Sequence, residues 1–136
     1  MTETVTIDAL GHGGDGIAET ADGRVYVAHA LPGETVTIER HGDRATVVDI
    51  ITASPDRVAP PLPHMTAVGT YPLVHMAEPA YLAWKTELVR AAFAQRGIAT
   101  PVEPIVPIRG GTRRRAVFAA IRTGRGVAIG FHKRHS

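Results

Sequence analysis

The 136-residue sequence predicts a mainly β protein with a single α-helix. Residues 5–51 alternate short apolar stretches with turn residues, a rhythm typical of a small all-β unit. Residues 53–79 contain six prolines, which disfavour regular structure, and apolar side chains then recur at helical spacing up to residue 96. We therefore expect a β-barrel at residues 1–55, a proline-rich linker at 56–78, and a helix followed by a β-hairpin at 79–136.

Glycine-containing turns separate the strands that we expect in the first part. The tripeptides 21–23 (Ala-Asp-Gly) and 41–43 (His-Gly-Asp) tolerate positive φ angles and can close hairpins, and Pro32-Gly33 is a strong turn pair. Four or five strands in about fifty residues favour a closed barrel, because so short an open sheet would leave its edges unpaired and bury little.

The helix expected at residues 79–96 has recognisable ends. Pro79 is tolerated in the first turn, and Gly97 follows Arg96 as a typical C-terminal stop. Its apolar stripe predicts a face packed on a core. Trp84 could also stack on a base, but its helical spacing favours core packing. The stripe consists of Tyr81, Trp84, Leu88 and Ala92.

Residues 113–122 and 126–134 predict the two strands of the hairpin, joined at residues 123–126. Both faces carry apolar residues in the middle, so we expect both to be partly covered. Because the strands are antiparallel, residues 113–115, which are all arginine, should lie near Lys133 and Arg134.

The charge is unevenly distributed along the chain. Residues 1–60 hold ten acidic and four basic side chains, and residues 61–103 hold three of each. The 33 residues after Glu103 carry eight Lys or Arg and no carboxylate. This basic segment predicts a polyanionic partner, although a solvated basic face is the simpler alternative.

The composition excludes several classes of protein. An apolar content of 44% with mixed charge indicates a globular chain, and no apolar run reaches the ~18 residues that would span a membrane. The N-terminus lacks the layout of a secretory signal, so we expect a cytoplasmic protein. With zero cysteines, the chain can form no disulfide, no thiolate metal site and no cysteine nucleophile.

Two further patterns suggest sites and have simpler explanations. Residues 11–16 match G-x-G-x-x-G, but another strand is expected where a dinucleotide site needs a helix. We expect a sharp bend that leaves His12 exposed on a loop. The pairs His64 with His75 and His132 with His135 lack the neighbouring ligands that a metal site needs, so no metal is expected.

Several segments occur together in the order known from one family. They are LGHGGDGIAETADGRVYVAHALPGETV, PPLPH, HMAEPAYLAWKTELV, TRRRAVFAA and GFHKRHS. In this order they resemble the N-terminal third of the bacterial uracil-C5 RNA methyltransferases that carry a TRAM domain. The resemblance implies an OB-like TRAM barrel at about residues 1–55, followed by the start of the family's central α/β domain, which contacts RNA.

The chain departs from the family in two respects. Many members hold a 4Fe–4S cluster on cysteines spaced C-x5-C-x2-C, and Leu62, Val68 and Tyr71 stand at those positions here. They provide no ligand, and we expect them to fill the space as a small apolar cluster. The chain also ends at Ser136, before the family's S-adenosylmethionine-binding domain and its catalytic cysteine, so this chain alone is expected to bind and not to catalyse.

The resulting hypothesis is an RNA-binding unit without a cofactor of its own. The expected partner is RNA, from single-stranded or loop regions of rRNA or tRNA. A protein-interaction or structural OB-type module is the alternative, and a cysteine-free hydrolase ranks last because no Ser/His/Asp arrangement is recognisable. The expected RNA contacts, near Tyr26 on the barrel and on the basic hairpin, are His12, Arg24, Arg113, Arg114, Arg115, Phe131, Lys133 and Arg134.

Overall fold

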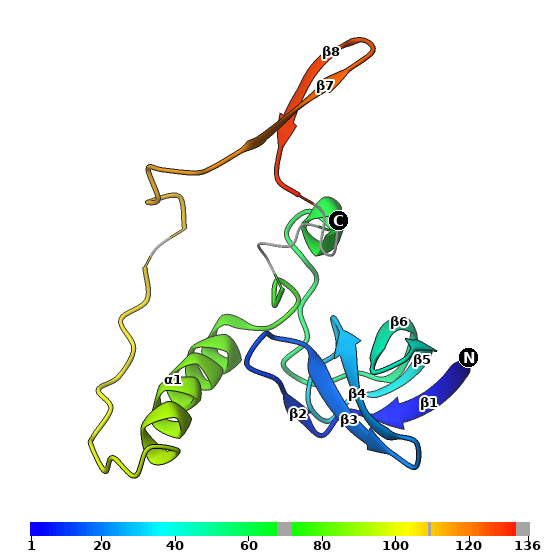
Figure 1. The fold of residues 1–136 in the computed structure, drawn as a ribbon. Coiled ribbons are helices and arrows are strands. Elements are labelled where there is room, and N and C mark those ends of the chain that lie inside the picture. The colour runs from blue at the N-terminus through cyan, green and yellow to red at the C-terminus, as the bar shows by residue number, and fades with distance from the viewer. Residues whose placement is uncertain (68–71, 109, 133–136) are drawn as a thin grey trace.

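The computed structural model describes residues 1–67, 72–108 and 110–132. They form a six-stranded sheet, a short 3-10 helix, one α-helix and a separate two-stranded sheet (Figure 1). The mainly β fold with one helix is thus confirmed. The first sheet contains β1 (Thr2–Thr6), β2 (Ala9–Leu10), β3 (Gly16–Thr20), β4 (Gly23–Ala28), β5 (Thr35–His41) and β6 (Arg44–Thr52). After them come the 3-10 helix η1 (Pro63–Ala67), α1 (Glu78–Ala94), β7 (Ala119–Thr123) and β8 (Gly126–Gly130).

The six-stranded sheet closes on itself. Its strand order is β1-β5-β6-β4-β3-β2, so the two end strands are neighbours in the sequence. The link between them bonds to both sides: the Ile7 amide donates to the Glu34 carbonyl at 2.9 Å, and the Asp8 amide donates to the Ile17 carbonyl at 2.8 Å. Strands β4 and β6 pair in parallel, and all other neighbouring strands of this sheet pair antiparallel. The structure therefore has a barrel, as expected, with one more strand than the upper estimate.

The barrel interior is filled by small branched and aliphatic side chains. On β4, Val25 and Val27 are fully buried while Arg24 is exposed, which is the alternation expected of a strand with one face on a core. The same alternation places Val36 and Ile38 of β5 inside. The buried cluster comprises Val5, Ile7, Ala18, Val25, Val27, Ala30, Val36, Ile38 and Ala45.

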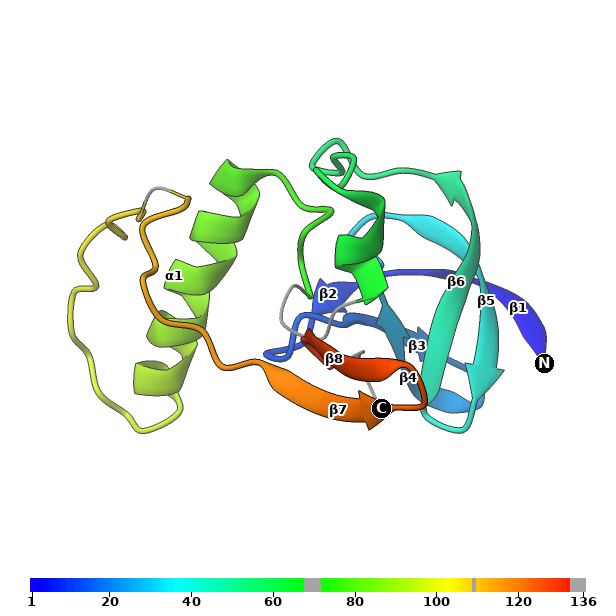
Figure 2. The ribbon, with the colours of Figure 1, turned by 90° about the horizontal axis from the view of Figure 1, so that it is seen from above.

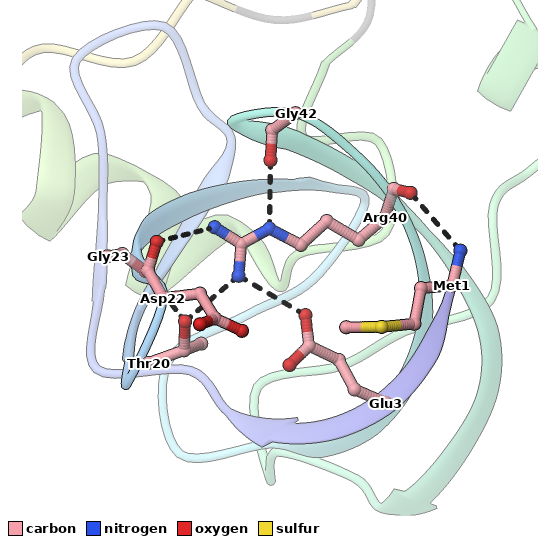
Figure 3. A network of polar contacts seen from close by, with 7 residues as sticks. All are labelled: Met1, Glu3, Thr20, Asp22, Gly23, Arg40 and Gly42. Atoms are coloured by element: carbon pink, nitrogen blue, oxygen red, sulfur yellow. Dashed lines mark hydrogen bonds and ion pairs between the residues drawn. The ribbon is translucent and has the colours of Figure 1, made fainter.

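Arg40 links three segments of the barrel (Figure 3). Its Nε donates to the Gly42 carbonyl at 2.8 Å, in the turn between β5 and β6. Its Nη1 donates to Glu3 Oε1 of β1 at 3.3 Å and to Thr20 Oγ1 of β3 at 2.9 Å. Its Nη2 donates to the Asp22 carbonyl at 3.3 Å. One guanidinium with several fixed donors thus holds together turns that are distant in the sequence.

A buried ion pair fastens the proline-rich segment to the barrel. Glu34 is fully buried, and its carboxylate accepts hydrogen bonds from Arg57 and from the backbone amides of Leu31 and Ser54. Arg57 also donates to the His29 carbonyl at 2.7 Å. Because burying a carboxylate is costly unless its oxygens are bonded, this arrangement specifies where the segment leaves the barrel.

The proline-rich segment contains one element that its composition did not predict, the single-turn 3-10 helix η1. The apolar cluster expected to replace the iron–sulfur site is only partly described. Leu62 is half exposed, and Val68 and Tyr71 lie outside the described residues. Leu73 is buried instead, against the glycine loop.

Helix α1 forms close to its expected bounds, but its expected burial is wrong. Pro79 lies in the first turn, and Gly97, with φ of +68°, follows the last turn. The Ile98 amide donates to the Phe93 carbonyl at 3.0 Å, which completes a Schellman-type stop. No residue of α1 is buried, because among the described residues nothing covers the outer part of its stripe.

The hairpin is shorter and more exposed than its sequence predicted. Strands β7 and β8 pair antiparallel from Ala119 opposite Gly130 to Thr123 opposite Gly126, so the ladder does not begin at residue 113. The expectation that both faces are partly covered is wrong: Val117 and Ile129 are 91% and 71% exposed. Figure 1 shows the hairpin projecting away from the barrel.

Candidate nucleic-acid interface

The glycine loop, residues 11–16, forms the predicted bend between β2 and β3. The Gly11 amide donates to the Asp15 carbonyl at 2.8 Å, and the Gly14 amide donates to the Gly11 carbonyl at 2.9 Å. Gly14 has a backbone φ angle of +88°, which residues other than glycine rarely adopt. His12 is exposed on this loop, as expected, and β3 follows in place of a helix.

A cavity of about 400 Å³ lies between the glycine loop and the first two turns of α1. The helix lies beside the barrel near β2 in both Figure 1 and Figure 2. The proline-rich segment forms the floor, through Leu73 and Val74. The remaining lining residues are His12, Gly13, Pro61, Pro72, Met76, Glu78, Tyr81, Trp84 and Lys85.

Two aromatic rings and one cation line the helix side of this cavity. The ring centroids of Tyr81 and Trp84 are 6.1 Å apart and the ring planes meet at 38°. Lys85 Nζ lies 5.5 Å from each centroid, within the range of a cation–π contact. The indole Nε1 of Trp84 is buried and has no hydrogen-bond partner among the described residues. The sequence pattern predicted that Trp84 packs in a core, so this site was missed. The adjacent Lys85 was a signal that this part of the helix faces solvent, because lysine is rarely buried.

A second candidate surface is the basic segment that leads into and through the hairpin, which we call the basic arm. Its described members are all exposed, and none forms an ion pair within the described residues. Among the described residues, the only bond that an arginine side chain of the arm makes is from Arg113 Nε to the Arg115 carbonyl, at 3.0 Å. The described members are Arg113, Arg114, Arg115, Arg122 and Arg125.

The four arginines of residues 1–60 differ, because each has a carboxylate partner. Arg24 Nη2 lies 2.6 Å from Glu19 Oε1, and the hydrogen bonds that the guanidinium donates to Glu19 and then to Tyr26 raise the pKa of Arg24 above its ordinary value. The other three pairs are Arg40 with Glu3, Arg44 with Asp15 and Arg57 with Glu34. The exposed Arg24 is therefore reachable by a ligand, but its charge is already partly compensated.

The remaining predicted site residues are placed as follows. Phe131 stands next to Phe118 on the hairpin, with ring centroids 4.9 Å apart, and both rings are partly exposed. Lys133 and Arg134 lie outside the described residues, so their expected proximity to residues 113–115 stays a prediction. His75 is buried against the ring of His29, and His64 is exposed.

No family model matches the chain, but curated proteins do. An uncharacterized RNA methyltransferase of Brucella suis is 44% identical over 135 residues, which are 99% of this chain and 32% of that protein. Another, from Agrobacterium fabrum, is 46% identical over 141 positions, 99% of this chain and 34% of the relative. The 23S rRNA (uracil(1939)-C(5))-methyltransferase RlmD of Halomonas elongata is 37% identical and covers 97% of this chain, with 29% of its own length.

The chain spans about a third of the length of these relatives. The alignments cover 97% to 99% of this chain, so they include the glycine loop, the helix and the basic arm and do not depend on any single motif. Over nearly its whole length the chain thus matches RNA methyltransferases, which confirms its resemblance to the family that includes the uracil-C5 rRNA enzymes.

Proposed function

We propose that this chain is the RNA-binding portion of a TRAM-containing, S-adenosylmethionine-dependent RNA (uracil-C5) methyltransferase. One observation carries the proposal: the described arginines of the basic arm are exposed and have no carboxylate partner, in a segment without acidic residues. Unpaired cations that face solvent gain most from phosphate contacts, because binding releases the counterions condensed on the nucleic acid. The similarity to RNA methyltransferases supports the same partner.

The barrel supports an oligonucleotide-binding role through its topology. A closed antiparallel order with one parallel contact, β4 with β6, is what we expect of an OB-type TRAM barrel. Single-stranded nucleic acid would then pass over loops and strand faces near His12, Arg24 and Tyr26. Since Arg24 is paired with Glu19, we assign the larger electrostatic contribution to the arm, namely Arg113, Arg114, Arg115, Lys133 and Arg134.

This chain by itself does not supply the chemistry of methyl transfer. Uracil C5 becomes nucleophilic when a thiolate adds to C6, and the chain contains no cysteine. A 4Fe–4S cluster does not fit either, because the positions of the family's cysteine ligands hold Leu62, Val68 and Tyr71. The methyl donor and the nucleophile would belong to the part of the relatives that the match leaves out.

The RNA class follows from the recognition mode that the fold allows. Bases that stack on side chains must be unpaired, so single-stranded or loop regions are the proposed target, in rRNA or tRNA. One relative is named for 23S rRNA, which favours rRNA. Within residues 1–67, 72–108 and 110–132, no helix combines the length and the apolar character of a membrane span. As a separate proposal, we place the protein in the cytoplasm.

The test is a fluorescence-anisotropy titration of the chain with labelled single-stranded and hairpin RNAs at two salt concentrations. If three residues of the arm contact phosphates, replacing Arg113, Arg115 and Lys133 by Ala should weaken binding. It should also reduce the slope of log K against log salt by about 2 for single-stranded RNA. The matched control replaces Arg44, Arg90 and Arg96, three exposed arginines elsewhere, and removes the same charge.

Equal effects of the two triple variants would mean that only net charge matters, and the basic arm would no longer be assigned as the RNA-contacting surface. Undetectable RNA binding at low salt would remove the proposed function altogether.

The exposed hairpin favours a second candidate, a module that docks on protein. Its apolar side chains, including Val117, Ile121, Val127 and Ile129, are more than half exposed. A large exposed apolar patch commonly marks a protein contact. Salt separates the two candidates, because affinity dominated by phosphate contacts falls by ~10²-fold or more between low and moderate salt, and protein docking changes less.

A further inference from the structure

We propose that the cavity between the glycine loop and α1 is a pocket for one unstacked base of single-stranded RNA, with Trp84 and Tyr81 as its stacking surface. The inference rests on the proposed RNA-binding function and adds a site to it. None of the RNA contacts derived from the sequence includes a residue of α1.

The helix side of the cavity has the groups that such a pocket needs. Aromatic rings bind bases with little sequence preference, because every base has a π-face. Lys85 Nζ lies 5.5 Å from both ring centroids, so the same side of the cavity also has a cation that can bind the phosphate of a nucleotide. The Trp84 indole Nε1 is buried, so the ring offers the base its face and not its N–H donor.

The barrel side contributes polar groups that could read the edge of the base. His12 lines the cavity and is exposed, so either ring nitrogen can donate or accept depending on its tautomer. Gly13 beside it presents backbone without a side chain, and even a Cβ there would meet nothing within 4 Å. The loop therefore leaves room for a ligand next to its backbone groups.

The size of the cavity favours a base over a peptide. A volume of about 400 Å³ falls within the range of small-ligand sites. The residues of α1 that line it, from Glu78 to Lys85, cover only two turns of the 17-residue helix. A partner helix would instead need an apolar groove that runs along several turns.

Trp84 is the only tryptophan of the chain, so its fluorescence reports on this cavity alone. Titration with a short oligouridylate should quench Trp84 emission, whereas ribose 5-phosphate, which has no base, should not. Replacing Trp84 by Leu should weaken oligouridylate binding by roughly 5- to 100-fold, the range found for losing one stacked base. Lys85→Ala should weaken it less, and Arg90→Ala, on the exposed side of the same helix, should be neutral.

Anisotropy of a labelled oligouridylate, followed in the same samples, separates the pocket from the general function. RNA binding without quenching of Trp84, and with full affinity in Trp84→Leu, would overturn the pocket and leave the RNA-binding proposal intact. No anisotropy change at low salt would overturn both. Far-UV circular dichroism checks that Trp84→Leu is folded, and Tyr81→Leu repeats the test on the second ring if it is not.

Discussion

At the scale of single residues, carboxylate pairing separates the arginines into two groups. The four arginines of residues 1–60 each have an acidic partner, and the described arginines after Glu103 have none. Among the paired ones, Arg57 differs because its partner Glu34 is fully buried. A buried pair of this kind contributes to specifying the fold and loses much stability when one member is removed.

Glu34→Gln should lower the free energy of unfolding by about 2–4 kcal/mol, because it leaves Arg57 without its counter-charge and weakens the bonds from the Leu31 and Ser54 amides. Urea unfolding followed by circular dichroism measures it. The control is Glu87→Gln, which breaks an exposed pair with Arg90 and should hardly move the midpoint. Similar midpoints for both variants would contradict the importance of the buried pair.

The same carboxylate predicts how stability depends on pH. Burial by itself raises the pKa of Glu34, but the hydrogen bonds from Arg57, Leu31 and Ser54 outweigh burial and lower this pKa below its ordinary value of 4.5. A lowered folded-state pKa means that the contribution is fully present above about pH 4.5 and is lost as the pH falls through the folded-state value.

Wild-type protein should therefore lose stability more steeply than Glu34→Gln as the pH is lowered below about 4.5, in urea unfolding measured at several pH values. Parallel curves for the two proteins would show that Glu34 does not carry this dependence.

At the scale of elements, glycines in the turns allow the chain to reverse direction between the barrel strands. Gly23, Gly33 and Gly42 lie where turns were predicted, and all three have positive φ angles. The glycine loop also contains a residue with a positive φ angle, Gly14, which in addition packs against Leu73 of the proline-rich segment. The loop therefore helps to fix that segment and, through it, the floor of the proposed pocket.

Gly14→Ala should destabilise the protein by about 1–2 kcal/mol, because the backbone is left-handed there and a Cβ would lie 3.3 Å from Leu73 Cγ. Gly13→Ala is the control, since a Cβ at that position meets nothing within 4 Å. Thermal unfolding compares the two variants. An unchanged midpoint for Gly14→Ala would mean that the loop relaxes at no cost.

For helix α1 and the hairpin, the sequence pattern predicted the position of the element but not the burial of its apolar side chains. Their positions in the chain could be predicted, since Pro79 and Gly97 set the ends of the helix and residues 123–126 set the turn of the hairpin. What covers their apolar side chains could not be predicted, because amphipathic spacing indicates that a face is suited to burial and not what it meets. The proposed domain boundaries at residues 55 and 78 stay predictions.

At the scale of the whole molecule, the chain combines a closed barrel with a hairpin that has no neighbouring strand in the described part. The barrel buries its apolar residues on its own, whereas β7 and β8 pair only with each other. An isolated two-stranded hairpin is marginally stable in water. The relatives are about three times as long as this chain, so they contain further residues that could pack on the equivalent hairpin and helix.

Hydrogen exchange should therefore divide the chain. Amides of β3–β6 should be strongly protected, and amides of β7 and β8 should exchange orders of magnitude faster, because their local opening exposes almost no new apolar surface. Mass spectrometry of peptides after timed exchange measures both regions in one sample, so the barrel is the internal control. Equal protection of the hairpin would reveal a packing partner that the described residues do not show.

The sequence by itself determined the local features of this protein: the turns, the ends of the helix, the segregation of positive charge after Glu103 and the family resemblance. Each depends on residues close together in the chain or on composition. The tertiary structure decided which charges are neutralised and which faces are left open. It paired Glu34 with Arg57 and brought the glycine loop beside Trp84, because contacts between distant segments depend on how the whole chain packs, which no local pattern encodes.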